Sequence, residues 1–175
     1  NKKYSEKQME VSMPLFMIGF KDNIKDKYQD AVKRHIAIEI ILNMIIGKSS
    51  TLYNNLYKEG YLLSQPDIEY EFGNEYAHVL IGGQSKDPKT VYEKILEKIN
   101  EMRENEINEQ DFERIKKKIY GDYAVEYNNV SDIGRMFASD YIKGINSFEY
   151  MNKFDEIDTN YLKQILQTAL NQILY

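Results

Sequence analysis

Hydrophobic and polar positions along the chain predict a strand, two helices and a hairpin, followed by four or five further helices. The run from Val11 to Phe20 is apolar on both alternating faces and predicts a mostly buried strand, with Pro14 near its start. From Lys27 to Ile46 the period becomes helical, and the second half is apolar nearly all round. Such a pattern is typical of a helix enclosed by its own domain. Gly47 follows at the position where glycine commonly ends a helix.

The next segments predict a short helix and a β-hairpin. Ser50 is a suitable N-cap for a helix that Gly60 ends. Two alternating runs, Ile68 to Phe72 and Tyr76 to Gly82, flank a Gly-Asn turn and predict paired antiparallel strands. The Gly82-Gly83 pair then predicts the end of the second strand.

The remainder of the chain has helical periodicity. The predicted helix starts are Asp87 followed by Pro88, Asn108, Ser131, Ser147 and Thr159. Gly144 ends one of these helices, and Ile173 to Tyr175 predict a closing strand. Because strands and helices are segregated, we expect an α+β fold, a mostly antiparallel sheet backed by helices in a two-layer sandwich. Residues 1–175 are predicted to form one domain.

Composition and charge exclude several classes of function. The 175 residues carry a net charge of −5, so the basic surface that phosphate backbones require is missing and no nucleic-acid partner is expected. The absence of cysteine excludes disulfides and thiolate sites, and His35 and His78 are too few for a three-histidine metal site. The longest apolar run is too short for a membrane span and no signal peptide is evident, so the expected compartment is the cytoplasm. A first residue Asn1 indicates that the natural start lies upstream.

One polar stripe stands out on the apolar helix. His35, Glu39 and Asn43 are spaced four residues apart and share one helix face. His35 and Glu39 could serve as a pair of metal ligands or as a hydrolase site. A solvent-facing or hydrogen-bonded stripe is the better-supported interpretation, because H-x-x-E-H and H-E-x-x-H are both absent. His78 lies in the middle of a predicted strand, where a structural role is favoured. No residue is therefore predicted to be catalytic or to bind metal.

A set of landmarks resembles the insulinase/pitrilysin family of zinc peptidases. The segment SSTLYNNLYKEG, Ser49 to Gly60, follows a buried helix that ends in IIG, and in this family S-S-x-L-[FY]-x-x-L follows such a helix. The hairpin IEYEF and AHVLIGG, the helix that begins with Asp87-Pro88 and the helix with Asn108, Phe112 and a lysine run follow in the family's order. The resemblance covers nearly the whole chain and is greatest to the processing-protease homologues of Gram-positive bacteria.

The resemblance implies a C-terminal-half domain, because the zinc motif H-x-x-E-H of the family belongs to the N-terminal half. Catalytic members carry an arginine after the S-S-x-L run and a tyrosine past the glycine, and both help to hold the substrate. Here these positions are Tyr57 and Leu63, so the usual pair is missing, although Lys58 offers a cation. The resemblance implies Tyr57, Lys58 and Tyr61 as the substrate-binding residues.

The function implied is that of a non-catalytic domain of the substrate chamber in a zinc-dependent peptidase. No cofactor is expected in this chain, since zinc would be bound by the other half. The expected partners are a peptide substrate and either the N-terminal half of the same chain or a paired homologous subunit, without a membrane. Exposed apolar surface would also favour a homodimer of this chain. The alternative function is a catalytically dead scaffold or interaction subunit of the same family.

Overall fold

The computed structural model describes residues 5–8, 10–22, 31–73, 76–170 and 172–174. Its described strands form one antiparallel sheet in the order β2-β3-β1-β4. The strands are β1 (Leu15–Asp22), β2 (Asp67–Phe72), β3 (Ala77–Gln84) and β4 (Gln172–Leu174). The predicted hairpin is confirmed as β2 and β3, and the predicted closing strand as β4, although Asn74 and Tyr175 lie outside the described residues.

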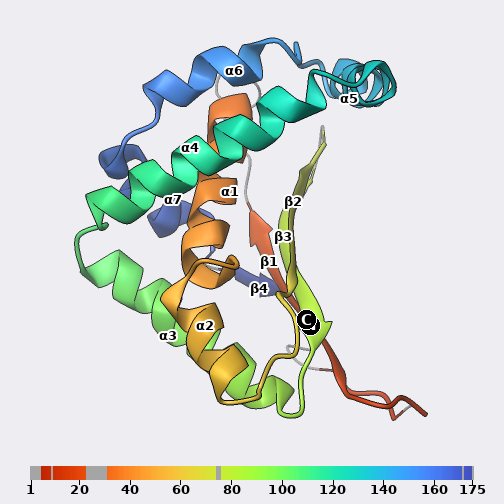
Figure 1. Cartoon of the computed structure of the whole chain (residues 1–175), viewed down its shortest axis with the longest axis vertical. Coiled ribbons are helices and arrows are strands. Elements are labelled where there is room, and N and C mark those ends of the chain that lie inside the picture. The colour runs from red at the N-terminus through yellow and green to blue at the C-terminus, as the bar shows by residue number, and fades with distance from the viewer. Residues whose placement is uncertain (1–4, 9, 23–30, 74–75, 171, 175) are drawn as a thin grey trace.

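The helices gather on one side of this sheet and leave its other face bare (Figure 1). They are α1 (Ala31–Ile46), α2 (Thr51–Lys58), α3 (Pro88–Glu104), α4 (Glu109–Glu126), α5 (Val130–Ile142), α6 (Glu149–Lys153) with the 3-10 turn Phe154–Glu156, and α7 (Thr159–Thr168). In Figure 1, α4 crosses over the upper part of α1, and α5 projects over the upper end of the hairpin. The predicted α+β architecture with a helix-backed antiparallel sheet is therefore confirmed.

Helix α1 is the centre of the hydrophobic core. It lies between the sheet and the other helices, which explains why its sequence is apolar nearly all round. Its buried side chains are Val32, Ile36, Ala37, Ile38, Ile40, Ile41, Leu42, Ile45 and Ile46. The window of residues 31–58 is apolar enough for a membrane span by length and composition, but 61% of it is buried inside the domain, as expected of a core helix. The predicted first residues of this helix, 27–30, lie outside the described part of the chain.

Two glycines that were predicted to end helices act by different means. Gly60 follows α2 with a φ of +72°, the left-handed conformation that favours glycine. Gly47 follows α1 without a positive φ, but a Cβ there would lie 2.5 Å from the carbonyl oxygen of Asn43. The chain needs glycine at 47 because the backbone turns back closely against the helix.

The predicted strand bounds need two corrections. The first strand begins at Leu15, after Pro14, and not at Val11. The Gly82-Gly83 pair does not end β3, which continues to Gln84. A Cβ at Gly83 would lie 3.2 Å from the ring of Phe16, so this glycine makes room for an aromatic side chain on the neighbouring strand.

The predicted caps of α2, α3 and α4 are confirmed. The side chains of Ser50, Asp87 and Asn108 accept hydrogen bonds from the backbone N–H groups of Tyr53, Thr90 and Asp111. Thr159 is confirmed as the first residue of α7, with Asp158 as its cap. Two other predicted starts are wrong. Helix α5 begins at Val130 with Asn129 as its cap, and not at Ser131, and the hydroxyl of Ser147 donates to Asp140 at 2.7 Å instead of capping α6. A nearby Asn caps the helix in the first case, and a buried carboxylate binds the serine hydroxyl in the second.

Candidate functional site

The residues predicted to bind substrate lie together at the end of α2. Tyr57 and Lys58 close the helix and are exposed, and Gly60 turns the chain toward Tyr61. The ring of Tyr61 is half-buried beneath the Nζ of Lys86, 4.6 Å from the ring centroid. Lys86 also donates a hydrogen bond to the carbonyl of Glu59 at 3.0 Å and so fixes this turn. The end of α2 thus presents tyrosine hydroxyl groups and lysine side chains. Contact of Tyr57, Lys58 and Tyr61 with substrate stays a prediction.

His35 of the polar stripe is withdrawn from solvent. Its Nδ1 lies 2.8 Å from the hydroxyl of Tyr150, and the rings of Tyr70, Phe72 and Tyr150 surround it at centroid distances of 5.4 to 5.6 Å. Burial, assisted by the positive charge of Lys143, lowers the pKa of His35 to about 4. The imidazole is therefore neutral near pH 7, and its role is that of a hydrogen-bonded core residue.

Glu39 occupies the middle of the same stripe and has a different environment. The hydroxyl of Tyr123 on α4 donates to its Oε2 at 3.1 Å. Burial raises the pKa of Glu39 to about 7, although the hydrogen bond from Tyr123 opposes that shift. Asn43 donates to the backbone carbonyl of Glu39 at 3.0 Å, so its amide serves the helix itself. Glu39 is thus the member of the stripe whose pKa lies close to neutral pH, so a charged group bound beside it would change its protonation.

A cavity of about 270 Å³ opens beside Glu39, between α1, α4 and the outer edge of β2, and we call it the β2 groove. Its lining residues are His35, Glu39, Leu42, Asn43, Ile68, Glu69, Tyr70, Asp122, Tyr123 and Glu126. The stripe on α1 was visible in the sequence. The α4 residues were missed, because they follow the stripe by about eighty positions and only the tertiary fold brings them to it.

A second carboxylate beside α1 is fully paired. Asp22, at the end of β1, is 2% exposed and binds the guanidinium of Arg34 in a two-pronged contact at 2.5 and 2.8 Å. The hydroxyl of Tyr70 donates to the same carboxylate at 2.8 Å, and Arg34 also reaches Thr168 on α7. This cluster joins β1, α1, β2 and α7, and no local pattern in the sequence indicates it.

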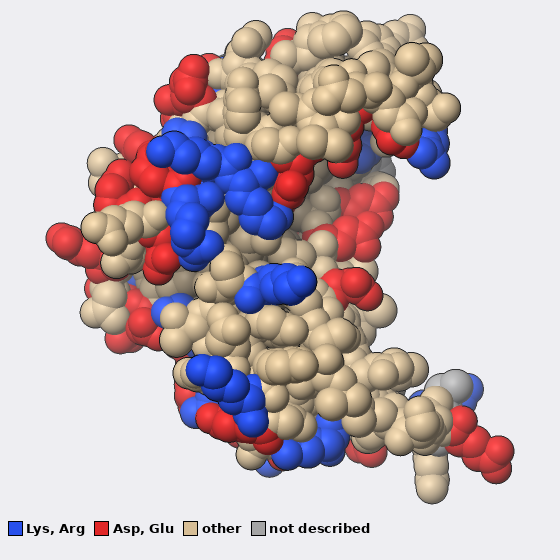
Figure 2. Space-filling model, viewed as in Figure 1, with Lys and Arg blue, Asp and Glu red and all other residues tan. Residues whose placement is uncertain are grey.

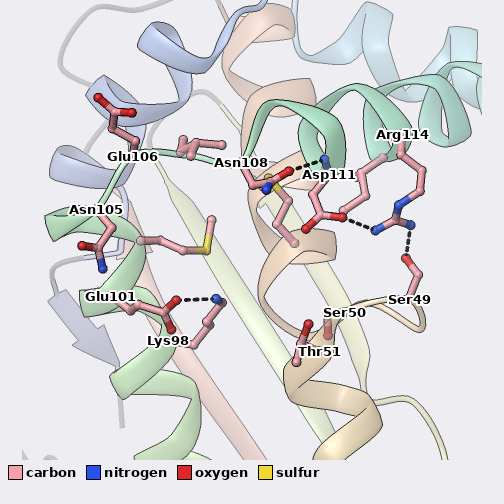
Figure 3. Close-up of a pocket in the computed structure, with 14 residues that line it drawn as sticks. Ser49, Ser50, Thr51, Lys98, Glu101, Asn105, Glu106, Asn108, Asp111 and Arg114 are labelled. Atoms are coloured by element: carbon pink, nitrogen blue, oxygen red, sulfur yellow. Dashed lines mark hydrogen bonds and ion pairs between the residues drawn. The ribbon is translucent and has the colours of Figure 1, made fainter.

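Another cavity, of about 140 Å³, lies in the helical layer where the ends of four helices meet, and we call it the helix-end pocket (Figure 3). Two ion pairs lie within single helices here, Lys98 with Glu101 at 2.9 Å on α3 and Arg114 with Asp111 at 3.0 Å on α4. Arg114 also donates to the hydroxyl of Ser49 at 2.7 Å, which joins α4 to the residues before α2. These contacts give the polar residues of the pocket a role in the fold.

The described side chains offer little for metal binding. Among them, no group of three His, Cys, Asp or Glu residues converges on one point. His35 is occupied by Tyr150, and His78 lies on the bare face of the sheet, stacked on Tyr76 and 4.0 Å from the carboxylate of Glu71. The residues present therefore do not fit a zinc site of the kind that hydrolytic enzymes use.

Comparison with known proteins gives one family. Residues 2–119 match the family described as the peptidase M16 inactive domain. The uncharacterized zinc protease YmfH of Bacillus subtilis is 24% identical over 173 residues, which is 97% of this chain and 40% of that protein. The chain therefore spans about two fifths of the length of this curated relative.

Solved structures share the fold at low sequence identity. A chain assigned as an M16-like peptidase from Alicyclobacillus acidocaldarius superposes with a TM-score of 0.87 at 21% identity, over 94% of this chain and 40% of that one. The inactive peptidase domain of a zinc protease from Bordetella parapertussis superposes with a TM-score of 0.75 at 9% identity, over 95% of this chain and 91% of that one. The second chain thus corresponds to a single domain of this kind.

Proposed function

The chain belongs to the peptidase M16 inactive-domain family, and on that premise we propose that it forms the non-catalytic wall of a peptide-binding chamber. The zinc and the residues that activate water would be supplied by a homologous half, either in the same polypeptide or in a paired subunit. The sequence resemblance to the C-terminal half of the insulinase/pitrilysin peptidases agrees with this family, as does the relation to YmfH.

The bare face of the sheet is the observation that carries the proposal. Helices cover one face (Figure 1), whereas the other carries exposed Leu15 and Met17 on β1 and, on the far side of β3, the acidic Glu69 and Glu71 of β2. Figure 2 shows this side hollowed, with acidic side chains gathered over the β2–β3 hairpin. A concave, largely uncovered sheet offers an unfolded peptide both apolar contact and charge.

Exposed apolar side chains on α5 support a protein partner. Val130, Tyr141 and Ile142 are 84%, 78% and 78% exposed, and Asp140 is the one buried residue of this helix. Single exposed apolar residues are ordinary, but several on one projecting helix are typical of an interaction surface. We infer that α5 contacts the homologous half, or a second copy of this chain when that half is absent.

Reconstitution of peptide hydrolysis tests the proposal. The homologous half that carries H-x-x-E-H is purified, and its rate on an unstructured fluorogenic peptide is measured with and without this chain. We expect this chain alone to be inactive and its addition to raise the rate at least about tenfold, because enclosure positions the substrate. A Met17→Glu variant, altered on the bare sheet face, should lose most of the gain, whereas the matched Lys89→Glu variant, altered on α3, should keep it.

A scaffold without a substrate role is the second candidate. The replacement of the usual arginine and tyrosine by Tyr57 and Leu63 favours it. In that case this chain would bind the homologous half tightly, but the hydrolysis rate would be the same with the Met17→Glu variant as with the unchanged chain. Full activity of the homologous half on its own would also contradict the chamber role.

A further inference from the structure

Strand β2 is an edge of the described sheet, and its outer hydrogen-bonding groups can be identified. Gly73 donates its N–H to the carbonyl of Tyr76 at 2.8 Å, which makes this pair a bonded one. Because bonded pairs alternate along antiparallel strands, Glu71 and every second residue before it also bond to β3. Ile68 and Tyr70 therefore direct their N–H and C=O groups away from β3, and no backbone bond within the described part of the chain pairs those groups.

The β2 groove lies alongside this edge. Ile68, Glu69 and Tyr70 form one wall, α4 forms the opposite wall, and α1 forms the floor. The space beside an unpaired edge strand is where an extended peptide can add as a further strand. Residues of an added strand would alternate, so that one set points into the groove and the other set lies beside the acidic side chains on the bare face.

The charge along this edge is negative on both faces. Glu39 and Glu126 line the groove, and Glu69 and Glu71 lie on the bare face. In the described structure, no ion pair with Lys or Arg satisfies any of these four carboxylates, and Glu71 is reached by His78 at 4.0 Å.

The nearby cations offset this charge only in part. Lys118 lowers the pKa of Glu39, but it is itself bonded to Asp122 at 2.6 Å and burial outweighs its effect. Lys21 lies on the bare face opposite His78, with β3 between it and β2. Lys143 lies over the ring of Phe72, 4.9 Å from the centroid, at the far end of β2. The edge therefore retains an excess of negative charge that a cationic ligand would complement.

We propose that the free edge of β2 pairs with an extended cationic peptide, whose Lys or Arg side chain enters the β2 groove beside Glu39 and Glu126. The proposal rests on the peptide-chamber function and adds to it the preferred substrate class and the strand that binds it. A basic side chain suits the groove because its aliphatic stem can pass Leu42 and Ile68 while its charged end meets the carboxylates.

The raised pKa of Glu39 supports the same assignment. A carboxylate that is largely buried without an ion pair lowers the stability of the fold, and a bound ammonium or guanidinium group would offset that effect. Groups with such perturbed pKa values are more frequent at binding sites than elsewhere.

Fluorescence anisotropy with three labelled peptides of ten residues tests the proposal. One alternates Lys with Val or Thr, the second replaces each Lys with Gln, and the third repeats the first with N-methyl groups on alternate backbone nitrogens. At pH 8 and low salt we expect the Lys peptide to bind at least about tenfold more tightly than the Gln peptide. The N-methylated peptide should lose most of this affinity, because it keeps its charge but cannot complete the strand pairing.

Substitutions in the chain locate the binding site. Glu39→Gln and Glu126→Gln should each weaken binding of the Lys peptide about two- to fivefold, as expected for single ion pairs. The matched Glu104→Gln, at the exposed end of α3, should leave it unchanged. Amide hydrogen exchange should slow at Ile68 and Tyr70 when the Lys peptide is bound.

Each other outcome overturns the inference in a distinct way. Equal binding of the Lys and Gln peptides on the bare face would leave the chamber function standing but remove the cationic preference. Protection of Ile68 and Tyr70 by the homologous half, and not by a peptide, would assign the edge to subunit contact. Binding of no peptide, in the presence or absence of that half, would contradict both the inference and the proposed function.

Discussion

Two carboxylates, Asp22 at the end of β1 and Glu39 on α1, are both withdrawn from solvent, yet their surroundings differ. Asp22 meets the guanidinium of Arg34 in two short contacts and accepts a third hydrogen bond from Tyr70. Glu39, five residues along the helix from Arg34, meets one tyrosine hydroxyl. The first arrangement is internally satisfied and needs nothing from outside the domain, whereas the second leaves a carboxylate facing an open groove. We therefore assign Asp22 a structural role that links elements of the fold, and Glu39 a role in binding a ligand.

Two titratable residues of α1, Glu39 and His35, make the stability of the fold depend on pH. The folded pKa of Glu39, about 7, lies above its ordinary value of 4.5, so its contribution to stability is present at low pH and is lost as pH rises from about 4.5 to 7. The folded pKa of His35, about 4, lies below its ordinary value of 6.5, so its contribution is lost as pH falls through that range. Between about pH 4.5 and 6.5 the two effects oppose each other.

The largest expected loss of stability follows from removal of the Asp22 carboxylate. Asp22→Ala leaves the charge of Arg34 without its partner in a largely buried position, so we expect a loss of about 3 kcal/mol in the free energy of unfolding. Urea denaturation at pH 7 measures it. The control Glu97→Ala removes an exposed partner of Lys94 and should cost less than about 1 kcal/mol. Equal losses for the two variants would show that Asp22 is not a cross-link.

Substitution of Glu39 is expected to raise the free energy of unfolding, not to lower it. At pH 8 Glu39→Gln should raise the free energy of unfolding by about 2 kcal/mol, because it removes a charge that burial disfavours and keeps an acceptor for Tyr123. At pH 5, where the carboxyl is protonated in the fold, the gain should shrink below about 0.5 kcal/mol. Denaturation at both pH values measures the difference. A loss of stability at pH 8 would contradict the description of Glu39 as an unsatisfied charge.

A smaller change in stability tests whether the polar residues of the helix-end pocket serve the fold, as Asp22 does, or a ligand. Ser50→Ala removes the buried N-cap of α2 and should cost about 1 kcal/mol. Ser49→Ala, next to it but exposed, should cost close to zero although it removes a contact with Arg114. Neither change should alter peptide binding to the β2 groove, and a change in that binding after Ser49→Ala would assign the pocket a role in function.

The smallest effect is expected at the end of α2. Lys58→Gln should raise KM for peptide in the reconstituted peptidase about twofold, with no change in stability, since the lysine is exposed and its charge is flexible. Lys117→Gln on α4, also exposed, is the matched control. An unchanged KM in both variants would remove the α2 end from the substrate surface.

Local features of the fold could be predicted from the sequence. The caps at Ser50, Asp87 and Asn108 depend on residues three positions apart, and the core helix and the hairpin depend on residues that are close in the sequence. Such features leave a pattern in hydrophobic period or in cap chemistry. The start of α5 was placed at Ser131 and not at Val130, because Asn129 is the residue that caps this helix.

The site depended on contacts that no local pattern reveals. Asp22 and Tyr70 are separated by 48 residues, and Glu39 and Tyr123 by 84. The polar stripe was recognised, but whether it faced solvent or a groove depended on where α4 crosses α1. The order of the strands was needed as well, because it leaves β2 at an edge beside that groove.

Photo-crosslinking of a bound peptide tests the central claim most directly. A peptide with a photoreactive residue at each position in turn is bound to the assembled peptidase, irradiated, and its attachment points in this chain are mapped by mass spectrometry. The account predicts attachment on the bare sheet face and in the β2 groove, at residues such as Met17, Glu69 and Glu126, and none in the helix-end pocket. Attachment confined to the helical layer, or to the homologous half alone, would contradict it.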